Sequence, residues 1–304
     1  MKRLNYYFTL CLVIFITLFS FANMFQIVRL SNQVISIVVE NLLPSLLPFM
    51  ILISLCLSLG IINLFSYLIQ WICIPLFSLS PIMSSIYFIS FFCGYPTNVK
   101  IIKESYELGY ISLQELQHLL GIASFASISF IFVSLKLEQP AIVYLCHIIP
   151  SICMALRYRK KQKWQTLAAS LERLRKPQMS IVSALKGSLI SSCYAFIFIF
   201  GYMLVFQFLA MALSPFISNP FLLVIIQGML EFSSGTLQLL RFTHTPLVYA
   251  LVCFNLSFAG ISVFMQTDNL LENIPYSFSK YVKARIFHGI LSFILCLIVC
   301  LIIF

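Results

Sequence analysis

One carboxylate, Glu231, lies in an otherwise uncharged stretch, Gln227-Gly228-Met229-Leu230-Glu231-Phe232-Ser233-Ser234-Gly235. A carboxylate at membrane depth is unfavourable by several kcal/mol unless it is paired, protonated or in contact with water. Ser233 and Ser234 supply hydroxyls and Gly235 a flexible backbone, and a helix break here frees amides that can bind an anion or a polar ligand. Three interpretations stay open: Glu231 lines a transport site, bonds to the broken backbone beside it, or lies at the membrane interface.

A second polar interruption, Gly94-Tyr95-Pro96-Thr97-Asn98, follows the apolar stretch from Ile82 to Cys93. Pro96 opens the helix because proline has no amide donor. Asn98 offers donors and an acceptor, and Lys100 attracts an anionic substrate. The alternative is a surface turn with a solvated lysine. We favour a binding role because a comparable break recurs in the second half of the chain.

A short phrase also recurs, as Ser124-Phe125-Ala126-Ser127-Ile128-Ser129 and as Ser257-Phe258-Ala259-Gly260-Ile261-Ser262. A serine in a membrane helix readily bonds to the carbonyls of its own helix, so each phrase alone is a weak signal. Repetition strengthens the signal, because duplicated polar breaks are typical of transporters. Ser127 and Asn255 complete the candidate substrate contacts.

Composition predicts the setting of these residues. Of 304 residues, 61% are hydrophobic and only 9% are charged, which predicts an all-α, polytopic helical membrane protein without a sizeable soluble domain. The net charge of +10 does not indicate a nucleic-acid partner, because eight basic residues fall between Arg157 and Lys176. We interpret that segment as a cytoplasmic loop. The ten cysteines form no CxxC pair and are expected to pack as small side chains.

The hydropathy pattern predicts five segments. Residues 1–30 form a retained transmembrane helix rather than a signal peptide, and 31–136 form a first repeat. Residues 137–178 contain a transmembrane helix and the basic loop, 179–266 form a second repeat, and 267–304 form a loop and a final transmembrane helix. We expect broken helices or re-entrant hairpins in both repeats.

Charge bias predicts the orientation of the repeats. The positive-inside rule places Lys2, Arg3, the basic loop, Lys280, Lys283 and Arg285 in the cytoplasm. The first repeat then starts outside and the second inside, so the two have opposite topology. Inverted repeats of this kind favour alternating access.

Prolines predict a further interruption within the first repeat. In Asn41-Leu42-Leu43-Pro44-Ser45-Leu46-Leu47-Pro48 both prolines disturb an apolar run, and a hairpin or broken helix is expected there. Glu40 and Asn41, just before it, lie either in the same cavity or at the membrane interface.

The sequence offers no pattern for metal or enzyme chemistry. His118, His147, His244 and His288 have no ligand spacing, and no Gly-rich phosphate loop occurs. A membrane hydrolase needs a nucleophile with a base or a metal, and neither combination is found. We therefore expect neither an enzyme nor a cofactor.

Four motifs carry a family resemblance: Asn41 to Phe49, Gly94-Tyr95-Pro96 with Lys100, Ile111 to Glu115, and Leu230 to Gly235. In this order they resemble the sporulation integral membrane protein YlbJ/SpoVV family, whose members contain nucleoside-recognition Gate domains. The resemblance extends from about Ser31 to Met265. It implies an architecture like that of concentrative nucleoside transporters. It also implies transport of dipicolinic acid from mother cell towards forespore during sporulation.

Together these observations predict a secondary transporter of a small anionic metabolite, with dipicolinate as the specific candidate. The helix ends at Pro96 and Ser233 hold the carboxylates, Lys100 and Lys186 attract the anion, and Glu231 carries a coupling proton or fixes a ring-side donor. We expect a multi-pass protein of the cell membrane, in a sporulating cell the outer forespore membrane. The alternatives are a nucleoside or another organic acid as substrate, or a non-transporting scaffold for spore or envelope assembly.

Overall fold

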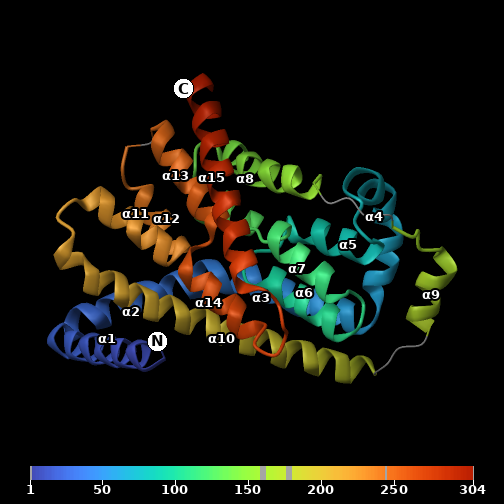
Figure 1. Cartoon of the computed structure of the whole chain (residues 1–304), viewed down its shortest axis with the longest axis horizontal. Coiled ribbons are helices and arrows are strands. Elements are labelled where there is room, and N and C mark those ends of the chain that lie inside the picture. Colours follow the sequence, from blue (N-terminus) through green and yellow to red (C-terminus); the bar gives the residue numbers. More distant parts are fainter. Residues whose placement is uncertain (1, 158–161, 176–179, 244, 304) are drawn as a thin grey trace.

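The structure is a computed structural model that describes residues 2–157, 162–175, 180–243 and 245–303. Within these ranges the secondary structure is helical and no strand occurs (Figure 1). In chain order the helices are α1 Lys2–Ala22, α2 Met24–Ile37, the π-helix η1 Val38–Leu42, α3 Leu43–Ser58, α4 Ile61–Phe77, α5 Pro81–Ser90, α6 Thr97–Glu107, α7 Leu113–Ile122, the π-helix η2 Phe130–Ser134, α8 Pro140–Ala155, α9 Leu167–Arg175, α10 Ile181–Leu213, the 3-10 turn η3 Ser214–Phe216, α11 Pro220–Leu230, α12 Phe232–Leu239, α13 Pro246–Phe258, α14 Gly260–Leu270 and α15 Phe278–Ile303.

Several helices are long and apolar enough to cross a bilayer. Three stretches meet this requirement alone, namely Ile181–Phe216, Pro246–Leu270 and Phe278–Ile303. The number rises to 5 if each of two sharply bent helix pairs counts as one span. The prediction of an all-α protein with several membrane spans is therefore confirmed at this level, and the long apolar helices suggest a multi-pass membrane protein.

The N-terminal region is bent rather than straight. Val13–Ala22 and Met24–Leu42 meet at 100°, so residues 1–30, expected to cross the membrane as one helix, include a sharp turn at Asn23. The Asn23 side chain donates to the Phe19 carbonyl over 2.9 Å. A polar side chain that bonds to the backbone in this way competes with continuation of the helix.

The proline-rich segment after Glu40, expected to form a hairpin or a broken helix, forms no hairpin, and the α-helix is interrupted there by the π-helical turn η1. The chain continues from α2 through η1 into α3, with helical backbone angles at Leu42 and Leu43. Pro44 is the second residue of α3, so its missing amide falls at the junction between the π-helical turn and the α-helix. The π-helical turn accommodates the disturbance, and the sharp bend falls later, where α3 and α4 meet at 94° around Gly60.

The two predicted breaks around Gly94 and Glu231 are present. The first separates α5 from α6, and the second separates α11 from α12 at Glu231 itself. Each pair is followed by another interrupted pair: α7 and η2 in the first half, α13 and α14 in the second. The same order of elements thus occurs twice along the chain.

Local sequence explains where these helices begin. Asn219 and Thr245 accept backbone amides as N-caps, and each is followed by a proline that needs no amide partner. Before α7, Ser112 and Glu115 form the predicted capping box, in which each side chain accepts the other's backbone amide.

Candidate functional site

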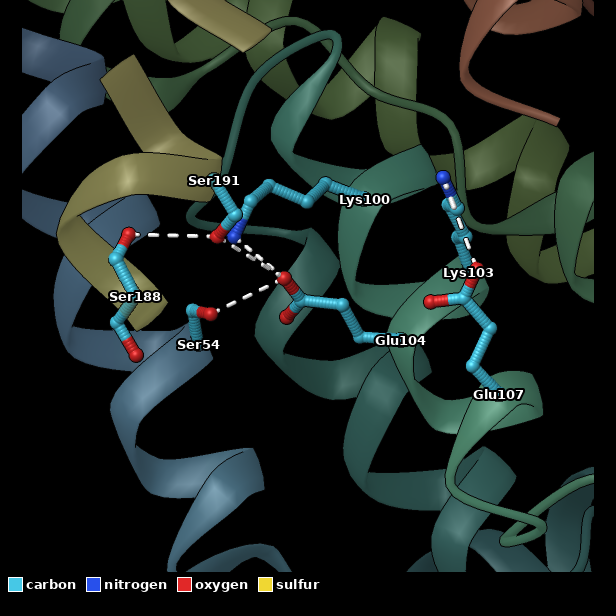
Figure 2. A network of polar contacts seen from close by, with 7 residues as sticks. All are labelled: Ser54, Lys100, Lys103, Glu104, Glu107, Ser188 and Ser191. Atoms are coloured by element: carbon cyan, nitrogen blue, oxygen red, sulfur yellow. Dashed lines mark hydrogen bonds and ion pairs between the residues drawn. The ribbon is translucent and has the colours of Figure 1, made fainter. Parts of the chain in front are cut away.

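The centre of the candidate site is a buried ion pair, Lys100 with Glu104, one turn apart on α6 (Figure 2). The distance from Lys100 Nζ to Glu104 Oε1 is 2.7 Å, and the side chains are 5% and 19% exposed. Ser54 of α3 donates to the same carboxylate oxygen over 3.0 Å, and Ser191 of α10 does so over 3.5 Å. Three helices therefore hold the pair in place.

The ion pair forms part of the wall of a cleft of about 530 Å³ between α6, α10 and the end of α14. Two cations, Lys100 and Lys103, line it together with three carboxylates, Glu104, Glu107 and Glu272. The cleft carries no excess of positive charge, so an anion that binds Lys100 must replace Glu104 there. The second oxygen of Glu104, Oε2, is buried and has no hydrogen-bond partner within the described residues.

A second lysine and glutamate pair provides an internal comparison. Lys103 and Glu107 have the same spacing on α6, but their side chains are 31% and 54% exposed and the atoms are 3.7 Å apart. Exposed ion pairs contribute about 0–1 kcal/mol to the stability of the folded protein. A buried pair behaves differently, because removal of one partner leaves an unbalanced charge in a poorly solvated place.

Glu231 lies at the break between α11 and α12 and is 2% exposed. Its carboxylate accepts the backbone amides of Ser233 over 3.0 Å and Ser234 over 2.9 Å, and therefore caps α12. It also accepts hydrogen bonds from the hydroxyls of both serines, and the side-chain amide of Gln207 of α10 donates to it over 3.4 Å. This is the arrangement in which the glutamate bonds to the broken backbone beside it. In this conformation the amides expected to hold a substrate carboxylate are bonded to Glu231.

Gly235 and Asn255 serve the packing of α11. A side-chain carbon on Gly235 would lie 2.2 Å from Gly228 Cα, so only glycine allows α11 and α12 to approach this closely. Asn255 of α13 packs on the other side, since a carbon on Gly228 would lie 2.2 Å from its Nδ2. Gly235 is inside α12 and is not the flexible break that its sequence suggested.

Gly94, Pro96, Asn98 and Ser127 are all buried where the first two breaks meet. A side-chain carbon on Gly94 would lie 2.8 Å from the Ser127 backbone nitrogen, so these two breaks touch. The side-chain amide of Asn98 donates a hydrogen bond to the Phe125 carbonyl over 3.3 Å. Pro96, which follows a cis peptide bond, is the N-cap of α6. The alternative of a surface turn with a solvated lysine does not match this burial.

The structure thus divides the predicted site residues into separate groups. Lys100 lines the cleft, whereas Glu231, Ser233, Ser234, Gly235 and Asn255 do not. Lys186 is exposed near the start of α10, directly before Gly187 of the cleft wall. Glu40 is exposed on η1. Of the predicted basic loop, residues 158–161 and 176 lie outside the described part of the chain.

Sequence reasoning missed Arg285. We expected it in the cytoplasm with Lys280 and Lys283, but its side chain is fully buried in α15. Arg285 donates to the carbonyls of Ser124 over 2.6 Å and Ser257 over 3.5 Å, and also to that of Gly121. Within the described residues no carboxylate pairs with it. The one guanidinium therefore bonds to both copies of the repeated serine phrase.

Histidines and a tyrosine complete this central network. His147 Nδ1 lies 2.7 Å from Ser257 Oγ, and His147 Nε2 accepts the Ala126 amide over 3.1 Å. His288 bonds to the His147 carbonyl over 2.7 Å. Tyr95 donates to the Ser124 carbonyl over 2.9 Å. These histidines join the breaks by hydrogen bonds, and the described residues contain no cluster that could hold a metal ion.

Some buried polar atoms near the breaks have no partner within the described residues. They are Thr97 Oγ1, Asn98 Oδ1, Gln227 Oε1, Thr236 Oγ1 and Asn255 Nδ2. A buried polar atom without a partner is unfavourable by about 1–3 kcal/mol. Such atoms therefore offer sites for water or a polar ligand.

Comparison with known proteins adds no assignment: no protein-family model, curated protein or solved structure matches this chain.

Proposed function

We propose that this protein is a secondary transporter of a small anionic metabolite and that the cleft beside Lys100 is its cytoplasmic entrance. The buried Lys100–Glu104 pair is the observation that carries the proposal. A paired charge in a poorly solvated wall is stable only while the lysine has an anionic partner. A carboxylated ligand can provide that partner in place of Glu104.

The exchange of partners also suggests how transport is coupled. When the ligand's carboxylate pairs with Lys100, the displaced Glu104 is left without its cationic partner in a poorly solvated wall, which is unfavourable while it carries a charge. In this proposal a proton neutralises the displaced carboxylate, so one proton and one anion enter the site together. This assigns to Glu104 the coupling role that the sequence suggested for Glu231, whose carboxylate is bonded to the start of α12.

The repeated order of interrupted helices supports an alternating-access mechanism. In this proposal α5 to η2 and α11 to α14 are the central parts of two inverted repeats, whose breaks pack together as in transporters with discontinuous helices. Movement of one repeat against the other would close the cleft at α6 and α10 and open a path on the opposite side.

Dipicolinate is the first substrate to test, because the motif order resembles a family linked to sporulation and because this anion carries two carboxylates. We place the protein in the outer forespore membrane, moving dipicolinate from mother cell towards forespore. A nucleoside is the second candidate from the same resemblance. It is uncharged, so its transport would not require Lys100.

Uptake by proteoliposomes tests the proposal. Wild-type protein should accumulate labelled dipicolinate when the proton gradient points in the same direction, and Lys100→Gln or Glu104→Gln should lower uptake at least about tenfold. The control is Lys283→Gln, which removes an exposed lysine of α15 that does not line this cleft and should retain uptake. Nucleoside uptake that is indifferent to Lys100→Gln would favour the second substrate. Folded protein that moves neither solute would indicate a scaffold.

A further inference from the structure

A second cleft, of about 370 Å³, lies between α7, the end of α8 and the start of α15. Arg157 and Lys280 line it with the polar side chains of Gln114, Gln117 and His118, and no carboxylate is among the described residues of its wall. This composition differs from that of the Lys100 cleft, in which three carboxylates balance two lysines. The second cleft is therefore suited to a free anion.

The fold brings the two cations together from distant parts of the chain. Arg157 lies two residues after the end of α8, and Lys280 lies in the first turn of α15. The start of α15 is fixed to α7 because the Ser277 amide donates to Gln117 Oε1 over 2.6 Å and Gln117 Nε2 donates to the Ser277 carbonyl over 3.4 Å. The position of Lys280 is thus determined by α7, even though its side chain is exposed.

Among the described residues of its wall, Arg157 and Lys280 are the two that make the cleft positive. Burial lowers the pKa of His118, which lies outside the candidate spans, to about 4. Its ring is neutral at pH 7 and provides polarity without charge. The sequence also predicts that Arg157 and Lys280 share one side of the membrane, because both belong to the basic segments that the positive-inside rule places in the cytoplasm.

An apolar stripe continues from the cleft along α15. Phe287, which lines the cleft, is 43% exposed. It is followed on the helix surface by Ile290, Ile294, Ile298 and Leu301, which are also exposed. Spacings of three and four residues keep these side chains on one helix face. From Phe287 to Leu301 the helix rises about 21 Å, more than the half-thickness of the hydrocarbon core, about 15 Å.

We propose that this cleft binds the phosphate headgroup of an anionic phospholipid, with one acyl chain lying along the stripe on α15. Arg157 and Lys280 pair with the phosphate, while the side-chain amide of Gln114 bonds to the glycerol oxygens and Gln117 holds the start of α15 in place. A soluble phosphate would use the cations but not the stripe. The positively charged cleft continues directly into the apolar stripe on α15, and this continuity favours a lipid over a soluble phosphate.

Lipid titration of the purified full chain tests this site. Phosphatidylglycerol should raise the thermal transition of the detergent-solubilised wild type more than phosphatidylcholine does. In Arg157→Gln with Lys280→Gln, half-saturation should need about 30-fold more phosphatidylglycerol, from roughly fivefold per charge near a membrane surface. Lys283→Gln is the matched control, because Lys283 is exposed on the same helix and does not line the cleft. An unchanged response in the double variant would overturn the proposal.

Two further measurements separate the sources of phosphate and guard against an unfolded variant. Glycerol phosphate alone should not raise the thermal transition. If this soluble probe stabilises the protein as much as phosphatidylglycerol does, the ligand of the cleft is a free phosphate and not a lipid. A photoreactive phosphatidylglycerol added to the wild type should label residues 114–122, 154–157 or 280–301. Labelling confined to other segments would contradict the site whatever the variants do.

Discussion

Arg285 of α15 donates a hydrogen bond of 2.6 Å to the carbonyl oxygen of Ser124, which lies 161 residues earlier in the chain. The carbonyls at the end of a helix lack partners within it and carry the negative end of the helix dipole. Arg285 satisfies such groups at the ends of α7 and α13 at once, through Gly121 and Ser257. One side chain thus joins the two halves of the molecule where their helices break.

Replacement of Arg285 should therefore destabilise the whole protein. Arg285→Met removes the donor to the carbonyls of Gly121 and Ser257 and should cost about 3–5 kcal/mol, within the range for loss of one partner from a buried charged network. The carbonyl of Ser124 keeps its bond from Tyr95. Thermal unfolding in detergent measures the effect. Lys283→Met changes an exposed neighbour on the same helix and is the control. Equal transition temperatures for the two variants would show that the Arg285 bonds are dispensable.

The buried and exposed ion pairs on α6 should respond differently to mutation. Lys100→Met alone strands the Glu104 carboxylate and should lower stability by about 3 kcal/mol, whereas Lys100→Met with Glu104→Leu should recover most of the loss. The corresponding changes at Lys103 and Glu107 should each cost less than about 1 kcal/mol. Two double-mutant cycles, measured by chemical denaturation, give the two coupling energies. Similar energies for both pairs would contradict the burial-based argument.

Loss of the Glu231 cap should affect folding before it affects any ligand. Glu231→Ala removes the acceptor for two buried amides at the start of α12 and should cost about 2 kcal/mol, at the upper end of the values for N-caps. Ser112→Ala, at the exposed cap of α7, should cost about 1 kcal/mol and serves for comparison. A larger loss from Ser112→Ala than from Glu231→Ala, read from thermal transitions, would disprove this ranking.

Glycine substitutions distinguish close packing from simple helix position. Gly235→Ala places a carbon 2.2 Å from Gly228 Cα and must separate α11 from α12. We expect a loss of more than about 3 kcal/mol or failure to accumulate folded protein. Gly201→Ala, where nothing lies within 4 Å, should be neutral or stabilising by about 0.5–1 kcal/mol. Size-exclusion profiles and thermal transitions of the two variants test the contrast.

Local signals predicted the helix breaks well. Pro96, the polar residues around Glu231 and the Ser112 capping box act within a turn of their own positions, so their effects are readable from sequence. Pro44 misled because it lies where the π-helical turn η1 joins α3 and the chain continues there as a helix, while the sharp bends fall at Asn23 and Gly60. Position within the turn decides what a proline does.

The central network could not be assembled from sequence, because several of its bonds join residues more than 100 positions apart, such as His147 with Ser257. One local signal did exist. Arg285, His288 and Ser292 recur at helical spacing on α15, and all three are buried. A polar stripe in an apolar helix indicates a face turned towards protein rather than lipid. The positive-inside rule grouped Arg285 with the cytoplasmic residues Lys280 and Lys283, because it counts charges near helix ends. The rule does not consider which face of the helix carries each charge.

Phosphatidylglycerol binding at the Arg157 and Lys280 cleft should be insensitive to pH near neutrality. The proposed contacts join a guanidinium and an ammonium group to a phosphodiester, and such groups do not ordinarily change charge between pH 6 and pH 8. His118 binds a proton only as pH falls through about 4, because its burial lowers the pKa from the usual 6.5. Half-saturation by phosphatidylglycerol should therefore agree at pH 6 and pH 8, measured with the same thermal readout at constant ionic strength. Tighter binding at pH 6, abolished by His118→Gln, would mean that protonated His118 supplies charge to the cleft and would contradict this prediction.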